Sequence, residues 1–160
     1  TKSFIDFVSL KDMINDVISC YTDGSNLLDQ LSSWAFIAVQ DDKIIHQDSG
    51  VLTGEICKLR NISGELKAAI MAIAWARKNN HKIEIWHDLE GIERWGTGKW
   101  KCNNKYTLGY KEYCIKNKDV IAAFRWVKSH KKDESVNTKY NNLVDKLAGD
   151  ALKEYKNAER

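Results

Sequence analysis

The chain of 160 residues has no proline and only 9 glycines, while 43% of its residues are hydrophobic. This composition excludes a disordered or low-complexity protein, because such chains are poor in apolar residues and rich in proline and glycine. Every apolar run is far shorter than the ~18 residues that a membrane span needs, so we expect no membrane segment. No charged and then apolar leader opens this sequence, so nothing in it argues for secretion.

The chain has few cysteines, and no two of them form the C-x-x-C pair typical of zinc knuckles and redox sites. They are Cys20, Cys57, Cys102 and Cys114. Their scatter indicates reduced thiols and a cytoplasmic protein rather than a disulfide framework. A single domain of this length can bury about 70% of the surface of its unfolded chain and needs no covalent cross-link.

The net charge of +3 conceals a strong asymmetry along the chain. Residues 1–55 carry 9 acidic and 3 basic side chains, whereas residues 96–140 carry 11 basic and 4 acidic ones. A basic segment of this kind favours a polyanion as partner, although ordinary domains also show such asymmetry.

Hydrophobic periodicity predicts one α/β domain. Residues 1–15 lack a clear period and are interpreted as an N-terminal extension or linker remnant, so the domain is expected over residues 16–160. Strands are predicted over residues 17–22, 34–40, 43–53, 82–86 and 120–127, and helices over residues 63–78, 91–95, 106–116 and 144–155. The order βββαβααβα indicates a mixed five-stranded sheet with helices on both faces.

Four acidic residues stand beside the ends of these elements. Asp23 follows the first strand, in a segment interpreted as a turn, and Asp88 directly follows the fourth. Glu65 is placed in the first turn of the first long helix, and Asp145 early in the last helix. Ligands of open α/β sheets bind beyond strand ends and at the neighbouring helix starts, so these positions suggest one site.

Each acid alone has an ordinary structural explanation. Asp23 suits a turn, Glu65 suits a helix start, Asp88 suits a helix cap and Asp145 suits a solvated surface. Four converging carboxylates are different, because they repel one another and raise one another's pKa. Divalent cations relieve that repulsion, and Mg²⁺ prefers the hard oxygen ligands of Asp and Glu. Two such ions ~3.5–4 Å apart stabilise the attacking and leaving oxygens of a phosphoryl displacement.

The four acids lie in the segments Y-T-D-G-S at 21–25, G-E-L-K-A-A at 64–69, W-H-D at 86–88 and N-N-L-V-D-K-L-A at 141–148. Two further segments are G-I-E-R-W at 91–95 and V-K-S-H at 127–130. In this order, over residues 16–156, the chain resembles the type 1 ribonuclease H family. The stretches R-N-x-x-G-E-L-K and H-D-x-E-G-I are most similar to the bacterial branch that often carries an N-terminal hybrid-binding module, of whose linker residues 1–15 would be the remnant.

This resemblance implies a ribonuclease H-like fold and hydrolysis of the RNA strand of RNA–DNA hybrids, leaving 5′-phosphate and 3′-hydroxyl ends. Asp23, Glu65, Asp88 and Asp145 would be catalytic and would hold two Mg²⁺ ions, with Mn²⁺ able to take their place. His130 would be the catalytic histidine of a mobile loop that assists proton transfer or product release, which suits a group titrating near neutral pH. A solvated loop residue is the alternative interpretation of His130.

The resemblance also implies a set of substrate contacts, in which an asparagine amide reads the minor groove and lysines neutralise phosphates. They are Gly24, Ser25, Asn61, Trp95, Lys99, Trp100, Lys101 and Asn141. For the two tryptophans, packing in the core is the alternative, and for the two lysines a solvated face. A monomer without an obligate protein partner is expected.

Three features depart from the family pattern. Residues 26–33 replace the usual glycine- and proline-rich turn, Asn142 stands where many members have Glu, and the segment between Trp95 and Tyr106 is short. The alternatives left open are an inactive nucleic-acid-binding module of the same fold and a related-fold nuclease acting on DNA. A zinc enzyme using His81, His87 and Cys102 is disfavoured, because these residues lack the usual ligand spacing.

Overall fold

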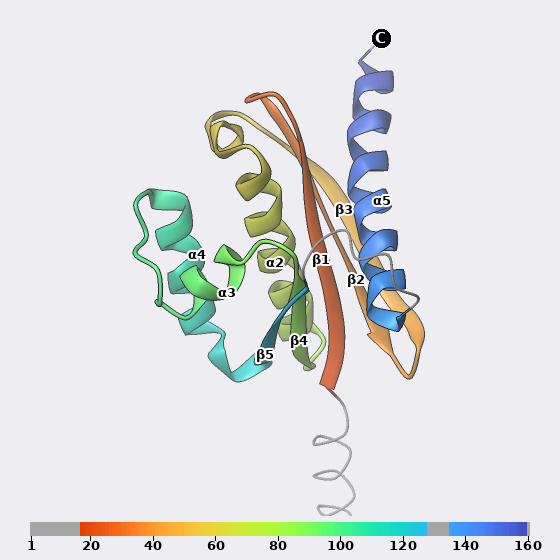
Figure 1. The fold of residues 1–160 in the computed structure, drawn as a ribbon, viewed down its shortest axis with the longest axis vertical. Coiled ribbons are helices and arrows are strands. Elements are labelled where there is room, and N and C mark those ends of the chain that lie inside the picture. The colour runs from red at the N-terminus through yellow and green to blue at the C-terminus, as the bar shows by residue number, and fades with distance from the viewer. Residues whose placement is uncertain (1–16, 128–134, 160) are drawn as a thin grey trace, which may run out of the picture.

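The computed structural model describes residues 17–127 and 135–159. Five strands form one sheet in the order β3-β2-β1-β4-β5 (Figure 1). The strands are β1 (Val17–Leu27), β2 (Leu31–Gln40), β3 (Lys43–Thr53), β4 (Lys82–His87) and β5 (Ile121–Trp126). The helices are α2 (Asn61–Lys78), α3 (Gly91–Gly96), α4 (Lys105–Lys116) and α5 (Val136–Ala158), with short 3-10 turns η1 (Glu55–Leu59) and η2 (Lys118–Val120).

The first three strands form an antiparallel meander, and β4 and β5 then add parallel to β1. Asp41 and Asp42 connect β2 to β3 with φ angles of 51° and 62°, the double positive φ of a two-residue hairpin turn. The expected mixed five-stranded sheet is therefore confirmed, and its parallel half brings the ends of β1 and β4 together.

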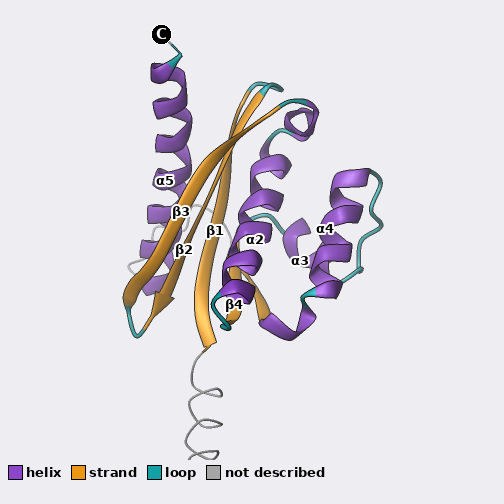
Figure 2. Ribbon diagram, turned by 180° about the vertical axis from the view of Figure 1, so that it is seen from behind, coloured by secondary structure: helices purple, strands orange, loops and turns teal. Residues whose placement is uncertain are grey.

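Helices cover both faces of the sheet (Figure 2). The helices α2, α3 and α4 lie on one face and α5 lies on the other. Alternation along β1 serves both faces, since Ile18 and Cys20 enter the core beneath α2 whereas Tyr21 enters the core beneath α5. The strand that carries Asp23 is thus anchored from both sides.

Several expected boundaries are wrong, and the two largest corrections concern the site. Residues 23–25 do not form a turn, because β1 stays hydrogen-bonded to β2 as far as Leu27 and the chain reverses at Leu28, whose φ is 60°. The last helix begins at Val136, where Ser135 accepts a hydrogen bond from the Thr138 N–H at 3.2 Å. Most residues in the first two turns of α5 are polar, so apolar periodicity did not indicate this part of the helix.

The four cysteines are free, and three of them are buried. Within the described ranges, no helix is long and apolar enough to cross a membrane.

Candidate active site

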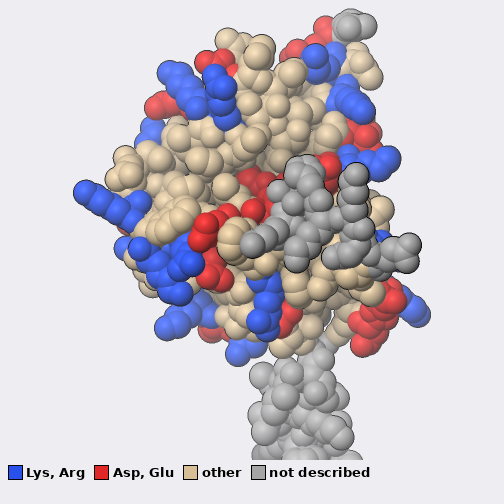
Figure 3. All heavy atoms as spheres, in the orientation of Figure 1, with Lys and Arg blue, Asp and Glu red and all other residues tan. Residues whose placement is uncertain are grey.

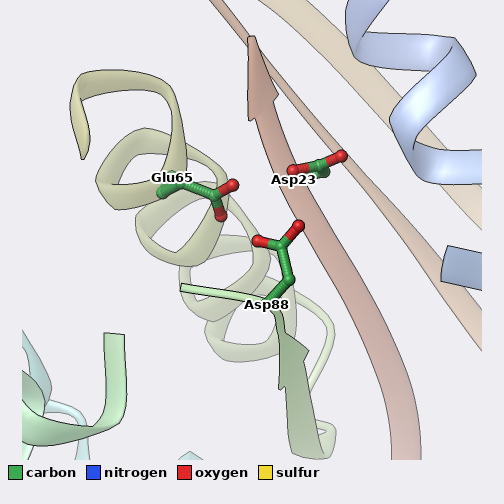
Figure 4. A group of neighbouring side chains, drawn as sticks. All are labelled: Asp23, Glu65 and Asp88. Atoms are coloured by element: carbon green, nitrogen blue, oxygen red, sulfur yellow. The ribbon is translucent and has the colours of Figure 1, made fainter. Parts of the chain in front are cut away.

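An open sheet edge beside β1 creates the site. Pairing between β1 and β4 ends at Tyr21 and Trp86, where the Thr22 hydroxyl donates to the Trp86 carbonyl at 3.1 Å. Beyond this point β1 continues, paired with β2 alone among the described strands. The chain leaving β4 and the N-terminal part of α2 approach β1 at this open edge (Figure 4).

Two glycines let α2 approach β1 at backbone distance. A Cβ atom on Gly24 would lie 2.5 Å from the Glu65 nitrogen, and a Cβ atom on Gly64 would collide with the Ser33 carbonyl oxygen. Only glycine at both positions permits this approach. Gly24 is therefore needed for close packing and not for a turn, and the contact carries Glu65 to Asp23.

Three carboxylates converge at this edge (Figure 4). Asp23 comes from β1, Glu65 from α2 and Asp88 from the chain after β4, and one oxygen from each lies within 4.8 Å of the others. Glu65 was expected in the first turn of this helix. Because α2 begins at Asn61, Glu65 is its fifth residue and lies just after the first turn. The Gly24 N–H donates to Asp23 Oδ1 at 2.9 Å and to Glu65 Oε1 at 3.2 Å, so one backbone amide orients two of the acids.

Burial makes the negative charge of this cluster unfavourable. Asp23 and Glu65 are each only 4% exposed. Burial raises the pKa of Asp23 to about 7, and the charges of Asp88 and Asp145 act in the same direction. Burial, followed by the hydrogen bonding and charge of Asp23, raises the pKa of Glu65 well above its usual value. Without a cation, the cluster therefore holds protons near neutral pH.

Asp145 lies beside the three carboxylates but does not belong to the group that meets within 4.8 Å. Its charge contributes to the raised pKa of Asp23, which shows that the two side chains are near one another. Asp145 is exposed and is the tenth residue of α5, so the expected position early in the last helix is wrong. The helix nonetheless brings it to the open edge, because the Ser33 hydroxyl of β2 donates to the Ala148 carbonyl at 2.6 Å.

The donor set fits a divalent cation. Glu65 Oε2 is buried and has no hydrogen-bond partner among the described residues. A buried carboxylate oxygen without a partner destabilises the fold, and a cation bound between the three acids would satisfy it. The oxygens of Asp23, Glu65 and Asp88 could therefore hold a hard ion such as Mg²⁺.

The zinc alternative is wrong for the described residues, among which only the three acids form a potential metal group. The His87 ring is fully buried, with Nδ1 2.9 Å from the Leu89 carbonyl oxygen. His81 stacks against Trp75, and the Cys102 thiol faces the Thr107 carbonyl at 3.5 Å.

Four expected substrate contacts border the acids. Gly24 and Ser25 follow Asp23 on β1, and both are half-buried. Asn61 is exposed at the first position of α2, four residues from Glu65 and therefore on the same side of the helix. Asn141 is half-buried on α5, one helical turn before Asp145. Their contact with a nucleic acid stays a prediction.

The other four expected contacts lie at the end of α3 and in the loop that follows. Trp95 is half-buried and Trp100 is 41% exposed, and their rings meet edge to face with centroids 5.7 Å apart. Lys99 and Lys101 are exposed. In the face shown in Figure 3, acidic side chains occupy the middle. Lys and Arg side chains gather beside them, on the side of α4. A polyanion crossing this face would meet cations beside the acids. His130 lies outside the described residues.

Sequence reasoning missed the supporting residues of the site. Gly64 and Ser33 do not belong to the predicted site residues, yet both determine how close the acid-bearing elements come. A glycine near the start of a long helix, where it lowers helix stability, is the signal that could have identified Gly64.

Several solved structures share this fold. The RNase H1 of the halophilic archaeon Halobacterium salinarum has a TM-score of 0.68 and 18% identity, over 86% of this chain and 98% of that one. The N-terminal RNase H domain of a Mycobacterium tuberculosis protein has a TM-score of 0.71 and 14% identity, over 91% and 99%. An RNase H1 isolated from compost, solved in complex with an RNA/DNA hybrid, has a TM-score of 0.62 and 17% identity, over 84% and 99%.

No curated protein sequence matches the chain. The family model described as RNase H matches residues 15–153, which is most of the sequence and includes all four expected acids. The solved structures have low identity and establish the fold, and none of the matches distinguishes the bacterial branch. Since the family model and the folds agree along the chain, the protein belongs to the RNase H family of hydrolases.

Proposed function

We propose that this protein is a divalent-metal-dependent endonuclease that hydrolyses the RNA strand of RNA–DNA hybrids and leaves 5′-phosphate and 3′-hydroxyl ends. The observation that carries the proposal is the meeting of three carboxylates from three elements within 4.8 Å, one of them with a buried, unpartnered oxygen. Membership of the RNase H family supports the reaction class. The hybrid bound by the compost RNase H1 supports the substrate class.

Asp23, Glu65 and Asp88 would hold the metal, with Asp145 completing the set for a second ion. Mg²⁺ is the expected ion, and Mn²⁺ could replace it. When bound, two such ions supply an activated water and stabilise the departing 3′ oxygen. The chain contributes orientation, because the Gly24 N–H fixes one oxygen each of Asp23 and Glu65 before any substrate arrives.

The residues around the acids suit recognition of a hybrid. Asn61 presents an amide on the Glu65 side of α2, and an amide can bond both a ribose 2′-hydroxyl and a base edge. Ser25 adds a hydroxyl next to Asp23. Lys99 and Lys101 are exposed, and in this proposal they neutralise phosphates of the DNA strand. Specificity for hybrids would then come from the 2′-hydroxyl contacts and affinity from the lysines.

The test is cleavage of labelled RNA–DNA hybrid, double-stranded RNA and double-stranded DNA, each with Mg²⁺ and with EDTA. We expect cleavage of the RNA strand of the hybrid alone, only with Mg²⁺, and none by the Asp88→Asn variant. Equal cleavage of all three duplexes, or full activity in EDTA, would contradict the proposal. Binding of the hybrid without cleavage would indicate the first alternative, an inactive nucleic-acid-binding module of the same fold. Cleavage of double-stranded DNA alone would indicate the second alternative, a related-fold nuclease acting on DNA.

His130 keeps its proposed role in proton transfer or product release. The His130→Ala variant should turn over more slowly while binding metal as the unmodified chain does. Loss of metal binding in this variant would show that the role is wrongly assigned. The cytoplasmic location, the monomeric state and the division at residues 15 and 16 also stay predictions.

A further inference from the structure

Three consecutive carbonyl groups around Asp88 each accept a hydrogen bond. The Val127 N–H donates to the His87 carbonyl at 2.7 Å, and the Trp126 indole N–H donates to the Asp88 carbonyl at 3.1 Å. His87 Nδ1 lies 2.9 Å from the Leu89 carbonyl oxygen. Because a carbonyl only accepts, Nδ1 carries the hydrogen in this contact. The Leu89 carbonyl also accepts a hydrogen bond from the Ile92 N–H at 3.1 Å. Two of the four donors are thus side chains.

Asp88 needs such support more than the other two acids. Asp23 lies in a paired strand and Glu65 in a long helix, so regular backbone hydrogen bonds set the direction of their side chains. Asp88 comes directly after the last residue of β4 and before α3 begins at Gly91. The direction of its carboxylate therefore depends on the contacts that hold this short connection.

The buried imidazole of His87 supplies a hydrogen-bond donor to the Leu89 carbonyl that an apolar side chain could not supply. The ring is fully buried and meets Phe124 of β5 edge-on, with centroids 6.0 Å apart. Its Nε2 is buried without a hydrogen-bond partner among the described residues. An apolar side chain in this place would avoid the cost of the unpaired Nε2 acceptor. What the imidazole adds over an apolar side chain is therefore the hydrogen bond from Nδ1 to the Leu89 carbonyl.

We propose that His87 and Trp126 are positioning residues that hold the Asp88 carboxylate toward Asp23 and Glu65, so that the three acids can bind a divalent cation. The inference rests on the proposed function. Partners of this kind, which orient a metal ligand without touching the metal, alter metal affinity roughly 10–100-fold when they are removed. Trp126 also couples the Asp88 connection to β5, from which it is remote in sequence.

The experiment measures Mg²⁺ affinity of the full chain by isothermal titration calorimetry, without nucleic acid. Trp126→Phe removes the indole N–H but keeps an aromatic ring, and His87→Leu removes the Nδ1 donor. We expect each to weaken Mg²⁺ binding roughly tenfold. His87→Asn, which keeps an N–H near the position of Nδ1, should restore most of the affinity. Trp75→Phe, a tryptophan on the far part of α2, is the matched control and should bind Mg²⁺ unchanged.

A second readout separates positioning from a general packing defect. In hybrid cleavage, the Mg²⁺ concentration for half-maximal rate should rise in Trp126→Phe by the same factor as the dissociation constant, while the rate at saturating Mg²⁺ stays near that of the unmodified chain. Unchanged Mg²⁺ affinity in Trp126→Phe and His87→Leu would overturn the proposal. If circular dichroism shows His87→Leu to be unfolded, Trp126→Phe alone decides.

The outcomes also separate this inference from the proposed function. If the unmodified chain binds Mg²⁺ and the variants bind it less tightly, but no hybrid is cleaved, the function is wrong and the positioning role is retained. If hybrid is cleaved and the variants show no change in Mg²⁺ dependence, the positioning role is wrong and the function is retained. A chain that binds no Mg²⁺ would overturn both.

Discussion

Among the residues that the structure describes, 17 buried residues form the core beneath α2, α3 and α4 on one face of the sheet, whereas 7 form the core beneath α5 on the other face. Hydroxyl groups supplement the smaller core, since Tyr21 donates to Asn137 Oδ1 at 2.6 Å and Tyr140 to Asp42 Oδ1 at 2.9 Å. The acids follow the same division. Glu65 on α2 is buried and oriented by a backbone amide, while Asp145 on α5 is exposed. The face with the larger core thus supplies a carboxylate whose position is fixed by packing, Glu65. The other face supplies Asp145, an exposed carboxylate that packing does not fix.

The largest expected effect separates the buried acids from Asp145. Asp23→Asn should lower the rate of hybrid cleavage on the order of 1000-fold, because it removes one carboxylate of the three-carboxylate group. Asp145→Asn should lower the rate on the order of tenfold, because that carboxylate lies outside the group. Initial rates at saturating Mg²⁺ measure both, and equal losses would show that the two acids are equivalent ligands.

A pair of glycine variants tests how tightly each helix is held. Gly64→Ala in α2 should lower the free energy of unfolding by about 3 kcal/mol or more, because the new methyl group collides with the Ser33 carbonyl. Gly149→Ala in α5 meets nothing within 4 Å and should raise stability by about 1 kcal/mol through helix propensity. Urea unfolding measures both. Similar effects at the two positions would contradict the backbone contact.

The raised pKa of Asp23, about 7, predicts a pH-dependent stability of the metal-free protein. Between its usual value near 3.8 and about 7, the native state binds a proton that the unfolded chain has released, so stability falls as pH rises through this range. We expect the free energy of unfolding to fall by roughly 3 kcal/mol over this range, which corresponds to a melting temperature lower by about 6–12 °C.

Thermal unfolding in EDTA between pH 5 and pH 8 measures this trend. Asp23→Asn should weaken the trend without abolishing it, because burial also raises the pKa of Glu65. Asp145→Asn should leave most of the trend in place, because burial is the main cause of both raised pKa values. Added Mg²⁺ should reverse the trend, since the ion binds the deprotonated acids. A metal-free protein that gains stability toward pH 8 would contradict the assigned direction.

The smallest expected effect compares one buried hydroxyl from each face. Tyr21→Phe removes the bond to Asn137 of α5, and Tyr110→Phe removes the 2.7 Å bond to the Ile92 carbonyl on the other face. Each should lower stability by about 1 kcal/mol. Only Tyr21→Phe should also slow hybrid cleavage, roughly twofold to threefold, because it loosens the helix that carries Asp145. Equal rates of hybrid cleavage by the two variants would show that the bond from Tyr21 to Asn137 does not help to position α5 for catalysis.

Much of the fold could be predicted, because periodicity reports which residues face a core. The alternation of β4 and the apolar stripe of α2 are properties of neighbouring residues, and both elements are present as expected. The continuation of β1 past Asp23 could not be predicted, because it depends on pairing of Gly24 and Ser25 with residues of β2. The start of α5 was missed for a related reason, since Asn137 and Tyr140 bond to remote residues, Tyr21 of β1 and Asp42 of the turn between β2 and β3.

The sequence by itself determined which four acids belong to the candidate site, and its basic middle segment already suggested a polyanion partner. Only the tertiary structure decided that Asp23, Glu65 and Asp88 meet within 4.8 Å, while Asp145 lies beside this group without belonging to it. The physical reason is that such distances arise from contacts between remote segments. Gly24 against Gly64 brings two acids together, and Trp126 bound to the Asp88 carbonyl holds the third.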